Sequence, residues 1–263
     1  MRRFGTHNNN HQVDEENPYW ISFSDIMAGL LVIFILAAVA LILELTQKRL
    51  QWDETIAELA EAEQVRKDIL REVAEELNEK NIPVYISDND TVLRIPEKVL
   101  TFKQGSFTIP SENEYRKNVL EIGNVLYQKI TKDNRWEKLD TIFVEGHTDR
   151  IPYRNDEIKG NWGLSAFRAI SLWDFWRYRM PKEALLKDLK NHSGKKLFSV
   201  SGYAATRPIP CSNSDPDVLN VTLCPNGPIA EAQSLAKNRR IDIRFTVKRP
   251  KLENYIAKDK ELK

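Results

Sequence analysis

One acidic residue lies inside a long apolar segment near the N-terminus. Between Glu16 and Glu44, 27 residues contain a single charged side chain, Asp25. A carboxyl group costs ~2.5–3.5 kcal/mol to insert at the centre of a membrane helix, and less near its end. Two interpretations stay open from the residues alone. Asp25 is either a proton-carrying carboxylate that meets a partner's polar cavity, or a headgroup-level residue before a helix that begins at Ile26.

Histidine and acidic residues elsewhere could perform acid–base or metal chemistry. His147 and Asp149 lie two positions apart, but no nucleophile pattern accompanies them, so a hydrolase is not favoured and we expect no enzyme. His7 and His11 could bind a metal, although a polar tail explains them more simply. We therefore expect no metal site and no bound cofactor.

The apolar segment itself predicts one transmembrane helix. Residues 26–43 carry no charge, and at ~1.5 Å per residue the whole stretch reaches ~40 Å, more than the ~30 Å of membrane hydrocarbon. A cleaved signal peptide is the alternative. It would need a shorter apolar region, positive charge where residues 14–16 are acidic, and a small-residue cleavage site that the chain lacks.

An acidic segment follows the apolar one. Residues 44–80 contain 11 acidic and 6 basic residues and neither proline nor glycine. Apolar residues recur in a heptad register, which predicts either a parallel dimeric coiled coil or a solvated helical spacer. The two heptad positions hold Leu45, Trp52, Leu59 and Val73, and Ile56, Leu70 and Leu77.

The remainder of the chain has a mixed pattern of strands and helices. A hairpin at 84–95, helices at 115–130 and 164–179, and strands at 141–145, 197–200 and 240–247 give the order ββαβαββ. The predicted fold class is α+β, in which helices pack on one mixed sheet as an α/β sandwich. The predicted parts are a tail (1–16), a transmembrane helix (17–45), a helical spacer (46–80), a domain (81–248) and a C-terminal tail (249–263).

Overall composition conceals these differences. The net charge is +1 and the mean hydropathy is −0.48, which excludes a multi-span membrane protein and gives no reason to expect nucleic acid as a partner. Residues 1–43 carry −2, residues 44–80 carry −5 and residues 81–263 carry +8. Only the predicted C-terminal domain is basic.

The segment around Asp25 resembles a known family. Residues 20–27, WISFSDIM, are similar to the start of the single membrane helix in stator B subunits of the MotB family. The resemblance implies that Asp25 accepts and releases a proton where it faces a ring of A subunits. Few oxygen ligands for sodium occur in residues 26–43, which also favours a proton as the transported ion.

Four C-terminal segments resemble the OmpA-like peptidoglycan-binding domain in their order. The resemblance implies that Asp149 binds the amino group of diaminopimelate, a zwitterion, and that Arg168 binds its carboxylate as a bidentate fork. It further implies that Asn161 and Leu164 line the pocket and that Arg240, or else Arg239, closes it. The segments are IFVEGHTD (142–149), NWGLSAFRA (161–169), SGY with RP (201–203 and 207–208) and NRRIDI (238–243).

Two cysteines, Cys211 and Cys224, frame an insertion between the last two of these segments. If the domain is periplasmic, its compartment is oxidising, and a disulfide is favoured over two free thiols. Charge does not set the orientation, because Arg2 and Arg3 are matched by Lys48 and Arg49 on the other side of the apolar segment. The resemblance to wall-binding motifs and the two cysteines together imply that the N-terminus is cytoplasmic and the C-terminal domain periplasmic.

The whole arrangement resembles a stator B subunit of the bacterial inner membrane. The resemblance implies a self-dimer, a ZorA-like or MotA-like A subunit with five copies around two B chains, and peptidoglycan as the anchor. Within this superfamily the chain is most similar to B subunits of the Zorya anti-phage defence system, which implies a proton-driven rotary complex. A flagellar MotB-type stator subunit and a passive OmpA-like wall tether are the two alternatives.

Overall fold

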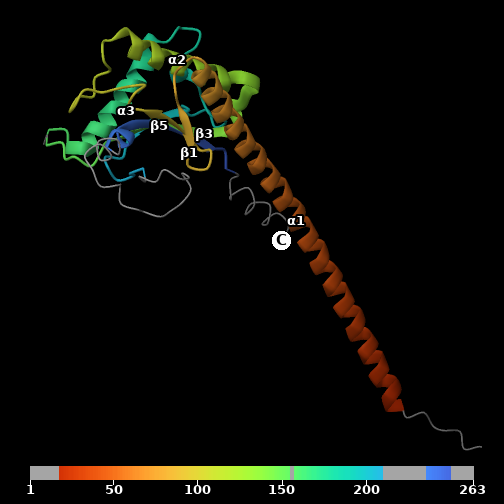
Figure 1. Cartoon of the computed structure of the whole chain (residues 1–263). Helices are drawn as coiled ribbons and strands as arrows, with labels where there is room; N and C mark the ends of the chain where they lie inside the picture. The colour runs from red at the N-terminus through yellow and green to blue at the C-terminus, as the bar shows by residue number, and fades with distance from the viewer. Residues whose placement is uncertain (1–17, 155–156, 210–234, 250–263) are drawn as a thin grey trace, which may run out of the picture. The chain divides into compact units, whose positions relative to one another are not determined.

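The computed structural model describes residues 18–154, 157–209 and 235–249. The chain divides into two compact units, Met1–Thr55 and Ile56–Lys263, and each is described by itself. The elements, in chain order, are α1 (Pro18–Glu79), β1 (Tyr85–Ser87), β2 (Val92–Pro96), α2 (Asn113–Thr131), η1 (Lys132–Lys138), β3 (Leu139–His147), α3 (Gly160–Arg179), η2 (Leu186–Asp188), β4 (Phe198–Gly202) and β5 (Arg240–Val247). Figure 1 labels α1, α2, α3, β1, β3 and β5.

The described part of the first unit is α1 from Pro18 to Thr55, which includes the apolar segment. Among the described residues, α1 is the one helix long and apolar enough to cross a membrane, with a mean hydropathy of 3.2 in its most apolar window. None of that window is buried in the protein, so this apolar part of α1 does not belong to a protein core. Asp25 lies seven residues after Pro18 and is therefore inside the helix rather than before a helix that begins at Ile26. The span 17–45 and its orientation stay predictions.

The second unit is built on one five-stranded mixed sheet with the order β1-β2-β5-β3-β4. The β1–β2 hairpin, β2–β5 and β5–β3 pairs are antiparallel, and β3 and β4 are parallel. The β1–β2 turn uses Asp88, Asn89 and Asp90, all at positive φ, a conformation that Asp and Asn tolerate better than most residues. The predicted α+β fold, an apolar helix followed by a domain with helices on a mixed sheet, is confirmed.

The two faces of the sheet differ in chemistry because side chains alternate along each strand. On β5, Ile241, Ile243 and Phe245 enter the hydrophobic core together with residues from α2 and α3. The residues between them, Asp242 and Arg244, form ion pairs on the other face. The domain therefore has one face covered by helices and one charged face.

The last part of the predicted spacer belongs to the domain rather than standing outside it. Ile69, Leu70, Val73 and Leu77 of α1 are fully buried in the domain core. Ion pairs along α2 and η1 add to this packing, such as Glu72 Oε1 with Arg135 Nη2 at 2.7 Å. The end of the predicted spacer therefore packs in the core of the domain, and its buried heptad residues contact that core.

Candidate functional site

A pocket of about 330 Å³ lies where the end of β3, the start of α3 and the loop after β2 meet. It brings together four of the five predicted ligand-binding residues. Its lining includes Glu97, Phe102, Gln104, Gly105, Thr148, Asp149, Ile151, Pro152, Tyr153, Asn161, Leu164, Arg168 and Arg239.

Two glycines allow α3 to approach the sheet closely enough to form this pocket. A Cβ on Gly146 of β3 would lie 2.0 Å from the carbonyl oxygen of Ser165. A Cβ on Gly202 of β4 would lie 2.5 Å from the backbone nitrogen of Ala166. Since no side chain fits at either position, the glycines set the distance between the end of β3 and the first turns of α3.

Asp149 is held in place by a backbone amide and by a cation. Its side chain is largely buried, and Oδ1 accepts a hydrogen bond from the Ile151 amide at 3.0 Å. Oδ2 accepts a hydrogen bond from Nη1 of Arg239 at 2.7 Å. A carboxylate has about four acceptor positions, so Asp149 keeps capacity for a ligand's ammonium group.

Asn161 positions the loop that follows Asp149. Its side-chain amide donates to the carbonyl of Ile151 at 3.0 Å and to that of Asp149 at 3.4 Å, and its carbonyl oxygen accepts from the Tyr153 amide at 2.9 Å. The contacts with Ile151 and Tyr153 bridge this irregular loop to α3. Asn161 thus fixes the approach to the pocket, while Leu164 supplies a buried apolar wall.

Arg168 is a buried cation facing this pocket. It is 4% exposed, its Nε donates to the Ser106 carbonyl at 3.0 Å, and its guanidinium lies 5.1 Å from the centre of the Phe102 ring. Burial lowers the pKa of Arg168, and the nearby carboxylates of Glu97 and Asp149 oppose that shift. Within the described residues, no carboxylate comes within ion-pair distance of it.

Arg239 lies across the pocket and bridges two carboxylates. Its Nε and Nη2 form a bidentate fork with Glu97 at 2.6 and 2.7 Å, and its Nη1 reaches Asp149. Hydrogen bonds with Glu97 and then Asp149 raise the pKa of Arg239. Sequence reasoning offered Arg239 as the alternative to Arg240 and did not select Glu97, which lies in no periodic pattern.

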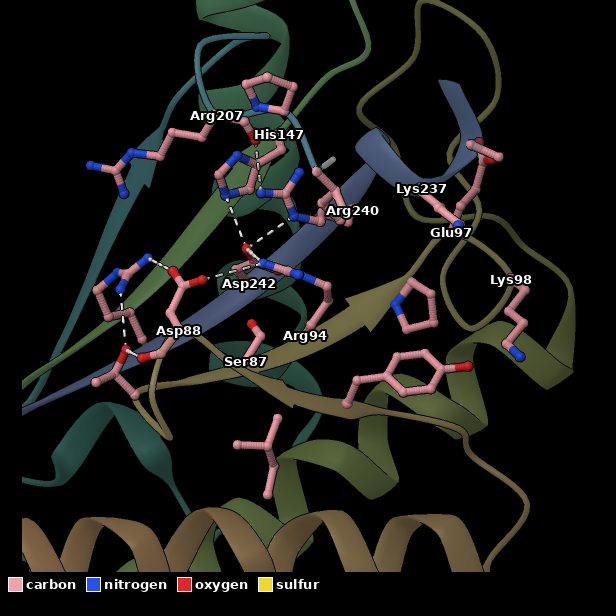
Figure 2. A pocket seen from close by; sticks show the side chains of 18 of the residues that line it. Ser87, Asp88, Arg94, Glu97, Lys98, His147, Arg207, Lys237, Arg240 and Asp242 are labelled. Carbon is pink, nitrogen blue, oxygen red and sulfur yellow. Dashed lines mark hydrogen bonds and ion pairs between the residues drawn. The ribbon is translucent and has the colours of Figure 1, made fainter. Parts of the chain in front are cut away.

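Arg240, the preferred residue of the sequence prediction, does not line this pocket, whereas its alternative Arg239 does. Figure 2 shows it on the charged face of the sheet beside His147, with its Nε bonded to Asp242 at 3.0 Å. Arg94 also forks with Asp242, at 3.0 and 3.1 Å. Burial raises the pKa of Asp242, but Arg240 and Arg94 outweigh it and the net shift is downward. The alternation of core residues Ile241 and Ile243 with Asp242 was the signal that could have placed Arg240 on this face.

The charges lining the pocket balance. Glu97 and Asp149 contribute two negative charges, and Arg168 and Arg239 contribute two positive charges. Arg239 forms ion pairs with both carboxylates, whereas the hydrogen bond of Arg168 goes to an uncharged backbone carbonyl. The arrangement suits a neutral ligand that carries a carboxylate for Arg168 and an ammonium for Asp149.

Two other sequence interpretations fall outside the described residues. The proposed disulfide between Cys211 and Cys224 lies there, as do His7 and His11. Across the described part of the chain, no group of three or more His, Cys, Asp and Glu side chains is arranged to hold a metal ion.

Comparison of the sequence with curated proteins finds one informative relative. The chain is 22% identical over 187 residues to motility protein B of Bacillus subtilis (strain 168), which covers 71% of this chain. The match spans 57% of the length of that relative. No protein-family model matches the chain.

Solved structures with similar folds include two MotB-type proteins. A putative MotB-like protein from Desulfovibrio vulgaris is 16% identical, with a TM-score of 0.45, and covers 72% of this chain and 99% of its own. The periplasmic domain of Helicobacter pylori MotB (residues 97–256) is 21% identical, with a TM-score of 0.43, and covers 68% and 99%. The cell wall anchor of the type VI secretion system (T6SS) from Pseudomonas aeruginosa is 19% identical, with a TM-score of 0.42, and covers 68% and 97%. Over most of its length, the chain is therefore similar in sequence to motility protein B.

Proposed function

We propose that this chain is a stator-type B subunit that binds peptidoglycan through the pocket between β3 and α3. Peptidoglycan stem peptides carry diaminopimelate, whose free end has one ammonium and one carboxylate. The observation that carries the proposal is Arg168, a buried cation that faces the pocket beside Asp149 without an ion-pair partner among the described residues. A buried charge is stabilised by a partner, and a ligand carboxylate would supply one.

Binding of the full chain in detergent to purified peptidoglycan sacculi tests the anchor. Arg168→Ala should weaken binding about 10- to 100-fold, because it removes a charge-assisted pair of about 1.5–3 kcal/mol. Arg179→Ala is the matched control, since Arg179 is an exposed arginine on the same helix. Unchanged binding by Arg168→Ala would reject the site.

A second variant separates binding from folding. Asp149→Asn preserves the size of the side chain but removes the charge that would hold the ammonium. It should also lose binding, while circular dichroism of the variant stays like that of the wild type.

Asp25 supports the motor part of the proposal. It is the single charged residue between Glu16 and Glu44, and it lies inside α1 rather than before it. We propose that it carries a proton at the interface with a ZorA-like or MotA-like A subunit, five copies of which surround two B chains in the inner membrane. Asp25→Asn should abolish proton flux and function without changing the membrane level of the protein, and Asp25→Glu should retain part of both. A passive tether predicts full function for Asp25→Asn.

The Zorya role is the most specific part of the proposal. It rests on the resemblance of the N-terminal segment, NPYWISFSDIMAGLL, and of the cysteine-framed insertion. Protection of cells from phage by this chain with its A-type partner would support it. Restored swimming in a strain without a flagellar stator would support the flagellar alternative instead, and co-purification of several A-type chains per B chain would exclude the tether.

A further inference from the structure

Glu97 lies in the same pocket as Asp149 and Arg168 but forms neither a hydrogen bond nor an ion pair with them. It follows β2 and pairs with Arg239 through both carboxylate oxygens, at 2.6 and 2.7 Å. Arg239 extends from this fork to Oδ2 of Asp149 at 2.7 Å. The three side chains form a row in which one cation lies between two anions.

This row determines what a ligand meets in the pocket. With Glu97 present, Arg239 is neutralised, and Arg168 is the cation left for a ligand carboxylate. Without the charge of Glu97, the pocket would hold two cations and one carboxylate. Arg239 would then have Asp149 as its one remaining ion-pair partner in the pocket, and it would compete with a ligand ammonium for that carboxylate.

We propose that Glu97 is a specificity-determining residue of the ligand site. By holding Arg239 and cancelling its charge, it makes the pocket select a zwitterion over an otherwise identical ligand that has the carboxylate but lacks the ammonium. The inference rests on the proposed function, because it takes the stem-peptide end as the ligand of this pocket.

The location of the pair makes the charge removable without loss of the fold. The side chain of Glu97 is 20% exposed and that of Arg239 is 31% exposed, and neither belongs to the hydrophobic core. Loss of the Glu97 charge therefore leaves the hydrophobic core untouched, and circular dichroism of Glu97→Gln should stay like that of the wild type. A change in binding with an unchanged spectrum then reports on the ligand site.

Calorimetric titration of the full chain in detergent tests this proposal with two probes. The first is the tripeptide L-Ala–D-Glu–meso-diaminopimelate, and the second is the same tripeptide with the side-chain amino group replaced by hydrogen. The wild type should prefer the first probe. Glu97→Gln should reduce the ratio of the two affinities on the order of tenfold, the size of one charge interaction across a partly solvated pocket.

Two further variants identify the cause. Glu97→Asp keeps the charge and should keep most of the preference, whereas a purely structural role would make it behave like Glu97→Gln. Glu183→Gln removes the same charge at an exposed position outside the pocket lining and should change neither affinity.

The outcomes distinguish this inference from the proposed function. If the wild type binds neither probe, the proposed ligand is wrong. If the wild type prefers the first probe and Glu97→Gln keeps the same affinity ratio, the anchor stands and the role of Glu97 is refuted.

Discussion

His147 should make the stability of the domain depend on pH in a range where few other groups contribute. Its side chain is 1% exposed and its ring stacks on Tyr203 with centroids 5.4 Å apart. Neither ring nitrogen has a hydrogen-bond partner among the described residues, although Nε2 lies 3.4 Å from Oδ2 of Asp242. Burial first, and then the charge of Arg240, lowers the pKa of His147 from 6.5 to about 3.

The sign and size of the effect follow from proton binding in the two states. Between pH 3 and pH 6.5 the unfolded chain binds a proton at His147 and the folded chain does not, so stability rises with pH across this window. With these two pKa values, acidification from pH 7 to pH 5 should lower the free energy of unfolding by about 2 kcal/mol. Carboxylates with lowered pKa values, such as Asp242 and Glu72, contribute at more acidic pH.

Hydrogen–deuterium exchange of the β3 and β5 amides in the full chain measures this free energy in detergent, after correction for the intrinsic exchange rate at each pH. The wild type should lose about 2 kcal/mol more than His147→Gln between pH 7 and pH 5. Between pH 7 and pH 8 the two proteins should change by nearly the same amount, because the imidazole is then mostly neutral in both states. If the wild type and His147→Gln lose the same free energy of unfolding between pH 7 and pH 5, the conclusion that His147 is buried in its neutral form is refuted.

Three substitutions test the packing that positions the site, each by the thermal or urea-induced unfolding of the domain. Gly146→Ala should destabilise it by about 3 kcal/mol or more, because the new Cβ would meet the Ser165 carbonyl at 2.0 Å. Trp176→Phe should cost about 1–3 kcal/mol, since the Val119 carbonyl loses the 2.7 Å hydrogen bond from Nε1. Leu70→Ala should cost about 2–5 kcal/mol if α1 belongs to the core, and a loss below 0.5 kcal/mol would contradict that assignment.

The strands and helices of the domain were predictable because their apolar residues repeat with the period of each element. The same periodicity could not tell where α1 joins the domain. An apolar heptad stripe such as the one with Leu70 and Leu77 can pack against a second helix in a coiled coil or against the core of a domain. The sequence pattern is the same in both cases, and the fold around the helix decides which packing occurs.

The candidate site was predictable where a motif marks it and not elsewhere. Asp149 and Arg168 occur in ordered motifs and meet in one pocket. Glu97 reaches the pocket from a loop after β2, and its role depends on Arg239, which is 142 residues away in the chain. A contact between residues so far apart in the chain cannot be predicted from the residues around either one.

Adjacent arginines at the start of β5 also have a consequence for how the chain can change. Arg239 belongs to the ligand pocket and Arg240 to the ion pairs of the opposite face, so two identical neighbours serve separate sides of the sheet. Neither can substitute for the other, because rescue would require the strand to slip by one residue and turn its core side chains outward. Substitution of Arg239 should therefore weaken ligand binding. Substitution of Arg240 should lower the stability of the domain.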